Sequence, residues 1–341
     1  MLHIDGSVGE GGGQIIRTAI ALAAITGTEV EIANIRANRP KPGLSAQHLH
    51  AVKAVARLAD GQTEGLALRS TRLTFAPGPL KGFEGTIDIG TAGSITLLLQ
   101  CLIPVTLFAD RATHVRITGG TDVAWSPPID FYTQVFLPAL KEMGCDVHLD
   151  VLQRGYYPQG GGVVDVTVQP VKQLKGFLAQ ESKRVEVIGG ISHSCGLPAH
   201  VAERQANAAN RLLRAAGYHA DLKTEIVEKS TWTTGCGITL WCGYKGGSAL
   251  GERGKRAEVV GEEAARNLTT ELQSSATVDV HLADQLVPYT ALADGPSELR
   301  VRAMTMHLET NLYITQQFLD VAGEIGQERT DGEAVFVIRK V

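Results

Sequence analysis

Hydrophobic residues recur along the chain at two alternating spacings, and this alternation predicts a mixed α+β protein. Helix-like runs such as residues 15–27 and 95–109 are each followed by a short strand-like run, at 29–35 and 114–118. A second helical run and a pair of strand-like runs joined by turn residues complete each set. The strand pairs are expected around residues 64–70 and 72–77 in the first set, and at 145–152 and 161–170 in the second. This order predicts split βαβ units with helices packed on sheets.

The set occurs three times, beginning at GEGGGQ, GTAGS and HLADQ, so we predict three pseudo-repeated βαβαββ units. Between the second and third copies, residues 181–276 break the pattern with helices and strands of their own. We therefore predict a discontinuous main domain of residues 1–180 and 277–341, and a smaller inserted α/β domain of residues 181–276. Its first predicted strand covers residues 184–192, and its glycine-rich residues 244–254, which lack a G-K-[ST] ending, are interpreted as a turn.

Composition narrows the class of protein. The chain has 341 residues, 44% hydrophobic and 20% charged, and no apolar run approaches the roughly 20 residues that span a bilayer. The N-terminus also lacks the basic flank and apolar core of a secretory signal, so a cytoplasmic protein without membrane contact is expected. The five cysteines are scattered and never spaced C-x-x-C, which indicates free thiols. His193, Cys195 and His200 have tolerable metal spacing but lack a convincing fourth ligand, so no metal is expected there.

Charge points to a local site rather than a basic coat. The formal net charge is −4, which argues against general binding of nucleic acid by phosphate neutralisation. Basic residues nevertheless concentrate within eighteen positions, at Arg36, Arg39, Lys41, His48, His50 and Lys53. A solvated basic face is the ordinary interpretation of such a cluster, although arginine forks suit phosphate oxygens.

The loop Gly9–Arg17, GEGGGQIIR, opens a helix with three consecutive glycines. Backbone N–H groups in such a loop can approach an anion, and a helix N-terminus favours negative charge. Glu10 is out of place there unless a divalent cation lies between it and a phosphate, so it is a candidate Mg²⁺ or Mn²⁺ ligand. A helix-start acid that complements the helix dipole is the alternative.

His307 stands alone between a strand-like run and a helical run. A lone histidine is usually a structural residue. Aligning the three copies, however, places it in the loop that carries Arg36 and Arg39 in copy one and Thr121 and Asp122 in copy two, and functional side chains gather in such loops. Asp284 is a candidate site residue or a helix cap, and Pro127 lies on a loop that suits packing of a flat base or only a turn.

Six segments in this order and at these spacings resemble the RNA 3′-terminal phosphate cyclase family: GEGGGQIIR, IRANRPKPGLSAQHL, GTAGSITLLLQ, RGYYPQGGGVV, HLADQL and HLETN. The resemblance covers essentially the whole chain. It implies an ATP-dependent ligase that converts an RNA 3′-terminal phosphate into a 2′,3′-cyclic phosphate with Mg²⁺ or Mn²⁺. It also implies relatedness in fold to a domain of a translation initiation factor and to enolpyruvyl transferases.

By matching to the family, His307 would be the nucleophile that carries AMP, and Glu10 would contact the metal. Phosphate and RNA-end contacts would come from Arg17, Arg36, Arg39, Gln47 and His48. Nucleotide contacts would come from Gln100, Pro127, His281, Asp284 and Gln285. His281 departs from relatives that place tyrosine there to stack on adenine.

Two other functions remain open at this point. One is the non-catalytic, cyclase-like branch that acts in ribosome assembly; the presence of His307, Glu10, Arg17, Arg39 and Asp284 argues against it. The other is an enolpyruvyl transferase, which the fold permits because fold alone does not set chemistry. The chain is short for that architecture.

Overall fold

Four small sheets and a central group of helices form the protein, and the mixed α+β class is confirmed. The computed structural model describes residues 1–179, 187–320, 323–330 and 333–340. The boundary expected between residues 180 and 181 and the first three residues of the strand predicted at 184–192 lie outside this range.

The first two sheets share one strand order. In each, the first two strands are parallel and the last two strands join antiparallel, as β1-β2-β4-β3 and β5-β6-β8-β7. The first sheet consists of β1 (Leu2–Asp5), β2 (Val30–Ala33), β3 (Gln62–Glu64) and β4 (Leu73–Ala76). The second consists of β5 (Glu84–Asp88), β6 (Thr113–Gly119), β7 (Asp146–Gln153) and β8 (Gly162–Gln169).

The third sheet has three strands in the order β13-β15-β14. They are β13 (Ser297–Val301), β14 (Gly323–Thr330) and β15 (Glu333–Lys340). Beside β13, Lys175 and Leu178 form isolated parallel bridges to Asp294 and Glu298, a position comparable to that of the first strand in the other two sheets. The preceding chain thus contributes to the edge of this sheet.

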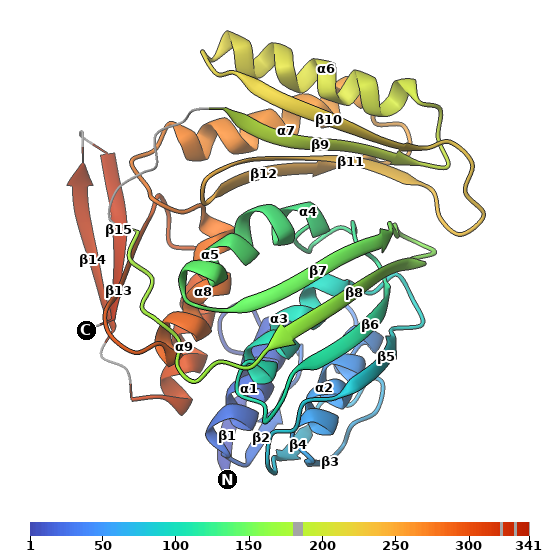
Figure 1. The fold of residues 1–341 in the computed structure, drawn as a ribbon. Helices are drawn as coiled ribbons and strands as arrows, with labels where there is room; N and C mark the ends of the chain where they lie inside the picture. Colours follow the sequence, from blue (N-terminus) through green and yellow to red (C-terminus); the bar gives the residue numbers. More distant parts are fainter. Residues whose placement is uncertain (180–186, 321–322, 331–332, 341) are drawn as a thin grey trace.

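Helices pack against one another between these sheets (Figure 1). They are α1 (Gly13–Thr26), α2 (Ala46–Leu58), α3 (Ile95–Thr106), α4 (Ile129–Phe131), the π-helical η1 (Tyr132–Phe136), α5 (Leu137–Glu142), α8 (Val280–Leu292) and α9 (Met306–Phe318). Helix α1 contacts α2, α3 and α9, and every residue from Gln14 to Ala24 is buried. Because α1 is buried along most of its length, a polar residue on it needs a partner inside the protein or a bound ligand.

Residues 187–276 form a separate sheet in the order β10-β9-β11-β12, with two helices and a hydrophobic cluster of its own (Figure 1). We call this unit the inserted sheet. Its elements are β9 (Ile188–Cys195), α6 (His200–Ala215), β10 (Ala220–Val227), β11 (Gly235–Cys242), β12 (Lys245–Leu250) and α7 (Ala257–Leu272). Treating it as an independent domain stays a prediction.

Two local predictions are wrong because glycine serves different purposes in different places. The expected turn at residues 244–254 contains strand β12, where glycine permits close packing: a Cβ on Gly247 would lie 2.3 Å from the backbone nitrogen of Leu268. Conversely, the strand expected at residues 64–70 ends at Glu64, because Gly65 turns the chain with a φ of +74°.

Candidate active site

A polar face on the buried helix α1 forms one side of the candidate site. Gln14, Arg17 and Thr18 are spaced i, i+3 and i+4, so they share one face of the helix. Helix α9 lies against this face and presents His307 and Asn311, which are also four residues apart. The first and last helices of the chain therefore meet along paired polar residues, which we call the α1–α9 seam.

Gln14 holds His307 at two points. Its Nε2 donates to the backbone oxygen of His307 at 2.9 Å, and its Oε1 accepts from Nδ1 of the imidazole at 2.5 Å. One turn further along, Thr18 Oγ1 donates to Asn311 Oδ1 at 2.6 Å, and Asn311 Nδ2 donates to the backbone oxygen of Asp284 at 2.7 Å. The seam thus fixes α9 to both α1 and α8.

His307 lies in the first turn of α9 rather than in the loop that was expected. Helix α9 begins earlier because Thr305 caps it, accepting a hydrogen bond from the backbone nitrogen of Leu308. Partial burial lowers the pKa of the His307 imidazole, an effect that Glu10 opposes and Arg17 reinforces. With Nδ1 donating to Gln14, the lone pair of the neutral ring is on Nε2, and the side chain is 47% exposed.

Glu10 lies between His307 and the loop that joins β2 to α2, residues 34–45. We call this segment, which carries Arg36 and Arg39, the basic loop. Its Oε2 is 3.0 Å from His307 Nδ1, and its Oε1 is 2.9 Å from Arg39 Nη2. The glycine at position 9 is required by this approach, because φ is +57° and a Cβ would lie 2.4 Å from Thr310 Oγ1 on α9. The loop therefore brings a carboxylate, an imidazole and a guanidinium into one cluster.

Arg17 is a buried cation whose charge is not neutralised nearby. It is 8% exposed, no carboxylate of the described residues comes within ion-pair distance, and its Nε has no hydrogen-bond partner among them. Burial lowers its pKa to about 10, although Cys101, Asp284 and Glu10 act in the opposite direction. A buried guanidinium in this condition is energetically costly unless it binds an anion.

The His48 ring packs against the glycine loop, whereas its neighbour Gln47 contacts the start of another helix. A Cβ on Gly13 would lie only 1.9 Å from His48 Nε2, so the imidazole fills the space that a side chain would need. Burial, then Arg17 and Arg36, lower the pKa of His48 to about 3, so the ring is neutral. Gln47 Oε1 accepts from the backbone nitrogen of Ser94, joining α2 to the start of α3.

Arg36 lies in the same loop as Arg39 and has a positive φ of 52°. Its Nη1 donates to the backbone oxygen of Gly43 at 2.9 Å, and partial burial followed by repulsion from Arg39 and Arg69 lowers its pKa. Arg39 therefore contacts the glycine loop through Glu10, whereas the guanidinium of Arg36 bonds to the backbone of its own loop and Arg17 is buried on α1.

The expected nucleotide residues divide into two groups. Asp284 and Gln285 lie on α8, where burial raises the pKa of Asp284 against the opposing charge of Arg17. Gln285 Nε2 donates to the backbone oxygen of His281, and its Oε1 is buried without a hydrogen-bond partner in the described structure. Asp279, rather than Asp284, caps the helix by accepting from the backbone nitrogens of His281 and Leu282.

Gln100 lies on α3, and the backbone of Pro127 is hydrogen-bonded to the same helix. Thr96 Oγ1 donates to the backbone oxygen of Pro127 at 2.8 Å, and Gln100 lies one turn further along the helix. Within the described residues we find no direct contact between either of them and His307 or Arg17.

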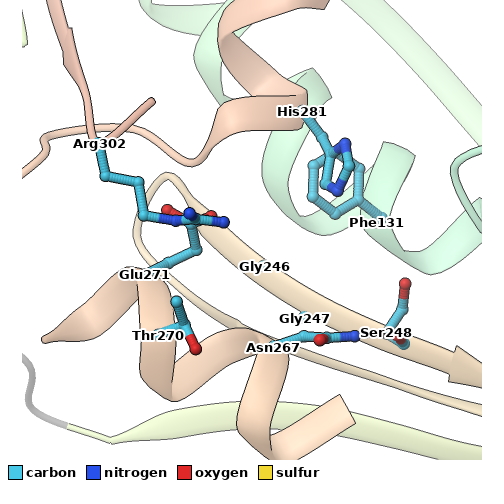
Figure 2. A pocket seen from close by; sticks show the side chains of 9 residues that line it. All are labelled: Phe131, Gly246, Gly247, Ser248, Asn267, Thr270, Glu271, His281 and Arg302. Atoms are coloured by element: carbon cyan, nitrogen blue, oxygen red, sulfur yellow. Dashed lines mark hydrogen bonds and ion pairs between the residues drawn. The ribbon is translucent and has the colours of Figure 1, made fainter. Parts of the chain in front are cut away.

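His281 borders a cavity of about 180 Å³ between α8, α4 and the inserted sheet (Figure 2). Its ring meets Phe131 edge-on, with 6.5 Å between centroids. On the opposite side, Arg302 Nε donates to Glu271 Oε1 at 2.8 Å. Besides His281 and Arg302, the polar lining comes from residues 248, 267, 270 and 271 of the inserted sheet, which sequence reasoning did not connect to the site.

Sequence reasoning also missed Gln14 and Asn311, the residues that position the histidine. A signal was present, because a glutamine four residues before a threonine stands out in the apolar run of α1, and His307 and Asn311 repeat that spacing. Asp122, in the loop aligned with that of His307, lies elsewhere, in a buried cluster with Arg154 and His193.

Comparisons with known proteins identify one family that this chain resembles along most of its length. The model of a family described as RNA 3′-terminal phosphate cyclase matches residues 8–325. A protein of that name from Archaeoglobus fulgidus is 52% identical over 94% of this chain and 96% of its own. One from Methanosarcina mazei is 48% identical over 96% and 97%, and one from Pyrococcus furiosus is 47% identical over 100% and 99%. Across the described residues, no helix is long and apolar enough to cross a membrane.

Proposed function

The chain belongs to the RNA 3′-terminal phosphate cyclase family of RNA-processing ligases, and we propose that it closes RNA 3′-phosphate ends to 2′,3′-cyclic phosphates at the expense of ATP through a covalent histidine–AMP intermediate. The observation that carries the proposal is Arg17: a buried, unneutralised guanidinium at the base of a glycine loop, beside a half-exposed histidine whose Nε2 is available. This combination suits a phosphate next to a nucleophile.

In the first step, Nε2 of His307 attacks the α-phosphorus of ATP. A P–N bond forms, the bond from the α-phosphorus to the bridging oxygen breaks, and pyrophosphate leaves. The imidazole needs its lone pair on Nε2, and the hydrogen bond from Nδ1 to Gln14 supports that tautomer. Glu10, 3.0 Å from Nδ1, stabilises the positive charge that the ring acquires when Nε2 forms its bond.

Two further transfers complete the reaction. An oxygen of the RNA 3′-phosphate attacks the phosphorus of AMP, the P–N bond breaks, and the RNA end becomes an RNA-pp-A anhydride. The neighbouring 2′-hydroxyl then attacks the terminal RNA phosphorus, loses its proton and expels AMP. We assign Arg39 and Arg36 to the incoming RNA phosphate, because both lie on the basic loop and Arg39 already contacts Glu10 at the histidine.

Glu10 also fits a role as ligand for Mg²⁺ or Mn²⁺, because its Oε2 is buried without a hydrogen-bond partner in the described structure and hard cations prefer carboxylate oxygens. The ion would offset the charge of the ATP phosphates. His48 supports the glycine loop and Gln47 holds α2 to the start of α3. We assign Asp284, Gln285, His281, Pro127 and Gln100 to the nucleotide side.

The test is protein labelling with ATP radiolabelled at the α-phosphate, in the presence of Mg²⁺ or Mn²⁺. We expect label that survives denaturation, is released by acid and is stable to base, as a P–N bond requires. His307→Asn should abolish it, whereas His148→Asn, an exposed histidine on β7, should not. Unlabelled protein incubated with ATP, the metal ion and RNA carrying a 3′-phosphate should then yield a cyclic end that resists phosphatase.

Absence of label in the wild type, or equal label in His307→Asn, would overturn the covalent mechanism. Label without cyclisation of the RNA end would leave the histidine as the AMP acceptor and overturn the assignment of substrate.

A further inference from the structure

A second buried cluster joins the inserted sheet to the second repeat, away from His307. At its centre is Arg154, in the turn between β7 and β8, which is 7% exposed. Its guanidinium makes a two-point contact with Glu225 of β10, at 2.9 and 2.8 Å. It also contacts Asp122 at 3.2 Å and Asp130 at 3.0 Å, both in the second repeat. Residues from two separately packed units therefore share one cation.

Asp122 directs one oxygen to this arginine and the other toward a histidine, whereas both oxygens of Asp130 lie near the arginine and one of them also faces the histidine. Asp122 Oδ2 accepts from Arg154 and from Thr121, whereas its Oδ1 lies 3.5 Å from His193 Nε2 on β9. Asp130 Oδ1 accepts from Arg154, and its Oδ2 lies 3.9 Å from the same nitrogen.

Three of the facing atoms lack a hydrogen bond. Asp122 Oδ1, Asp130 Oδ2 and His193 Nε2 are buried with no hydrogen-bond partner among the described residues, although Arg154 Nη1 is 3.0 Å from Asp130 Oδ2. The three atoms lie within 4.8 Å of one another. On its other side, His193 Nδ1 is 2.7 Å from the hydroxyl of Tyr156, which can accept the Nδ1 proton and leave the Nε2 lone pair directed at the aspartates.

The charges of this cluster do not balance. Asp122, Asp130 and Glu225 supply three carboxylates, while in the described structure the basic groups within ion-pair distance of them are Arg154 and His193. The Glu225 side chain is half exposed, so the buried part of the cluster holds two carboxylates and one guanidinium. An excess of negative charge inside a protein favours a further cation.

We propose that Asp122, Asp130 and His193 bind a divalent transition-metal ion, with Zn²⁺ as the representative of the class, that fastens the inserted sheet to the second repeat. Imidazole nitrogen with carboxylate oxygen is a donor set that such ions accept. Bonds of about 2.0–2.2 Å in a tetrahedron require donors roughly 3.4 Å apart, close to the 3.5 and 3.9 Å separations here. The three donors come from the loop after β6, from α4 and from β9.

These three candidate ligands are not the three residues whose spacing in the sequence suggested a metal site. His193 was considered with Cys195 and His200, but Cys195 Sγ instead lies 3.9 Å from the backbone oxygen of Thr233. The two aspartates lie 63 and 71 positions before His193 in the chain, which no local spacing could show. The proposal is independent of the AMP chemistry at His307.

The test uses full-length protein with Glu10→Ala, which removes the candidate metal ligand at the other site. After treatment with chelator, it is titrated with Zn²⁺ by calorimetry and with Co²⁺ by visible absorption. We expect one tight site, a tetrahedral Co²⁺ spectrum and a higher unfolding temperature with Zn²⁺. Adding His193→Asn should weaken binding at least 100-fold and remove the temperature shift, whereas adding His148→Asn should change neither.

If His193→Asn does not fold, Asp122→Asn keeps the shape of the side chain and should weaken binding in the same way. A stoichiometry of zero in the Glu10→Ala protein, binding unchanged in both added variants, or a Co²⁺ spectrum without the tetrahedral bands overturns the proposal. Because the readouts are metal content, spectrum and unfolding temperature, a failure here is distinguishable from a failure of histidine adenylylation.

Discussion

The side-chain amide of Gln14 makes two hydrogen bonds to His307: it donates to the backbone oxygen and accepts from the imidazole ring. One residue thus fixes both the position of the histidine on α9 and the tautomer of its imidazole. Gln14 is itself held by packing, because it is buried at the start of a helix that is buried along most of its length. The orientation of the proposed nucleophile is therefore set by helix packing rather than by a flexible loop.

Gln14→Leu should slow adenylylation of His307 by about 10- to 100-fold, because two hydrogen bonds worth about 1 kcal/mol each are lost. Gln14→Glu, which keeps the acceptor for Nδ1 and loses the donor to the backbone, should recover part of the rate. Single-turnover labelling with α-labelled ATP measures this effect, and the KM for ATP should change little. A wild-type rate in Gln14→Leu would show that these two hydrogen bonds do not contribute to catalysis.

Arg17→Met should weaken ATP binding by about 10- to 100-fold, since hydrogen bonds to charged groups contribute about 1.5–3 kcal/mol. The free energy of unfolding should stay constant or rise, because the variant no longer buries an unneutralised charge. Equilibrium nucleotide binding and urea unfolding measure the two quantities. Arg266→Met, at an exposed position on α7, serves as control and should affect neither. Lower stability with unchanged binding would make Arg17 a structural residue.

Glu10→Gln should shift the acid limb of the adenylylation pH profile to lower pH. The Glu10 carboxylate raises the pKa of His307 against the stronger effect of burial, so its removal lowers that pKa further and the neutral imidazole persists into more acidic solution. The maximal rate should fall as well. Glu309→Gln, on the exposed side of α9, should leave the limb in place. A limb that stays fixed or moves upward in Glu10→Gln contradicts the assignment.

His48 makes stability depend on pH. Its pKa is about 3 in the folded protein and about 6.5 in an unfolded chain, so between these values the unfolded state binds the extra proton. Stability is therefore retained above about pH 6.5 and decreases as the pH falls, by about 2 kcal/mol between pH 7 and pH 5 from this residue. Urea unfolding at the two pH values should show a smaller difference in His48→Gln than in wild type, and no such reduction in His148→Gln.

Much of the fold could be predicted because it is encoded in local periodicity. The apolar runs of α1 and α3 and the alternation of β8 identify their elements with errors of a few residues at the ends. The same local signals failed at β12, where the glycines reflect the close approach of α7 rather than a turn. Whether a glycine allows a turn or a tight contact is decided by neighbours that are distant in sequence.

In the candidate site, too, the sequence identifies residues but not their partners from distant parts of the chain. Residue types and their resemblance to a family identified His307, Glu10 and Arg17 as candidates, and the structure places all three around the glycine loop. The surroundings that give each its properties came only from tertiary packing: Gln14 for the histidine, and for Arg17 the lack of an ion-paired carboxylate among the described residues. Spacing in the sequence carries no information about such relationships.

The α1–α9 seam also has a consequence for how the protein acquires its activity. Gln14 and His307 are separated by 293 positions, so an emerging polypeptide carries its glycine loop and Arg17 long before the histidine is synthesised. Until α9 arrives, the start of α1 has no partner for Gln14 or Thr18, and the proposed AMP acceptor does not exist. Competence for nucleotide transfer is therefore confined to nearly complete chains, and loss of the segment from α9 onward leaves a protein without the proposed chemistry.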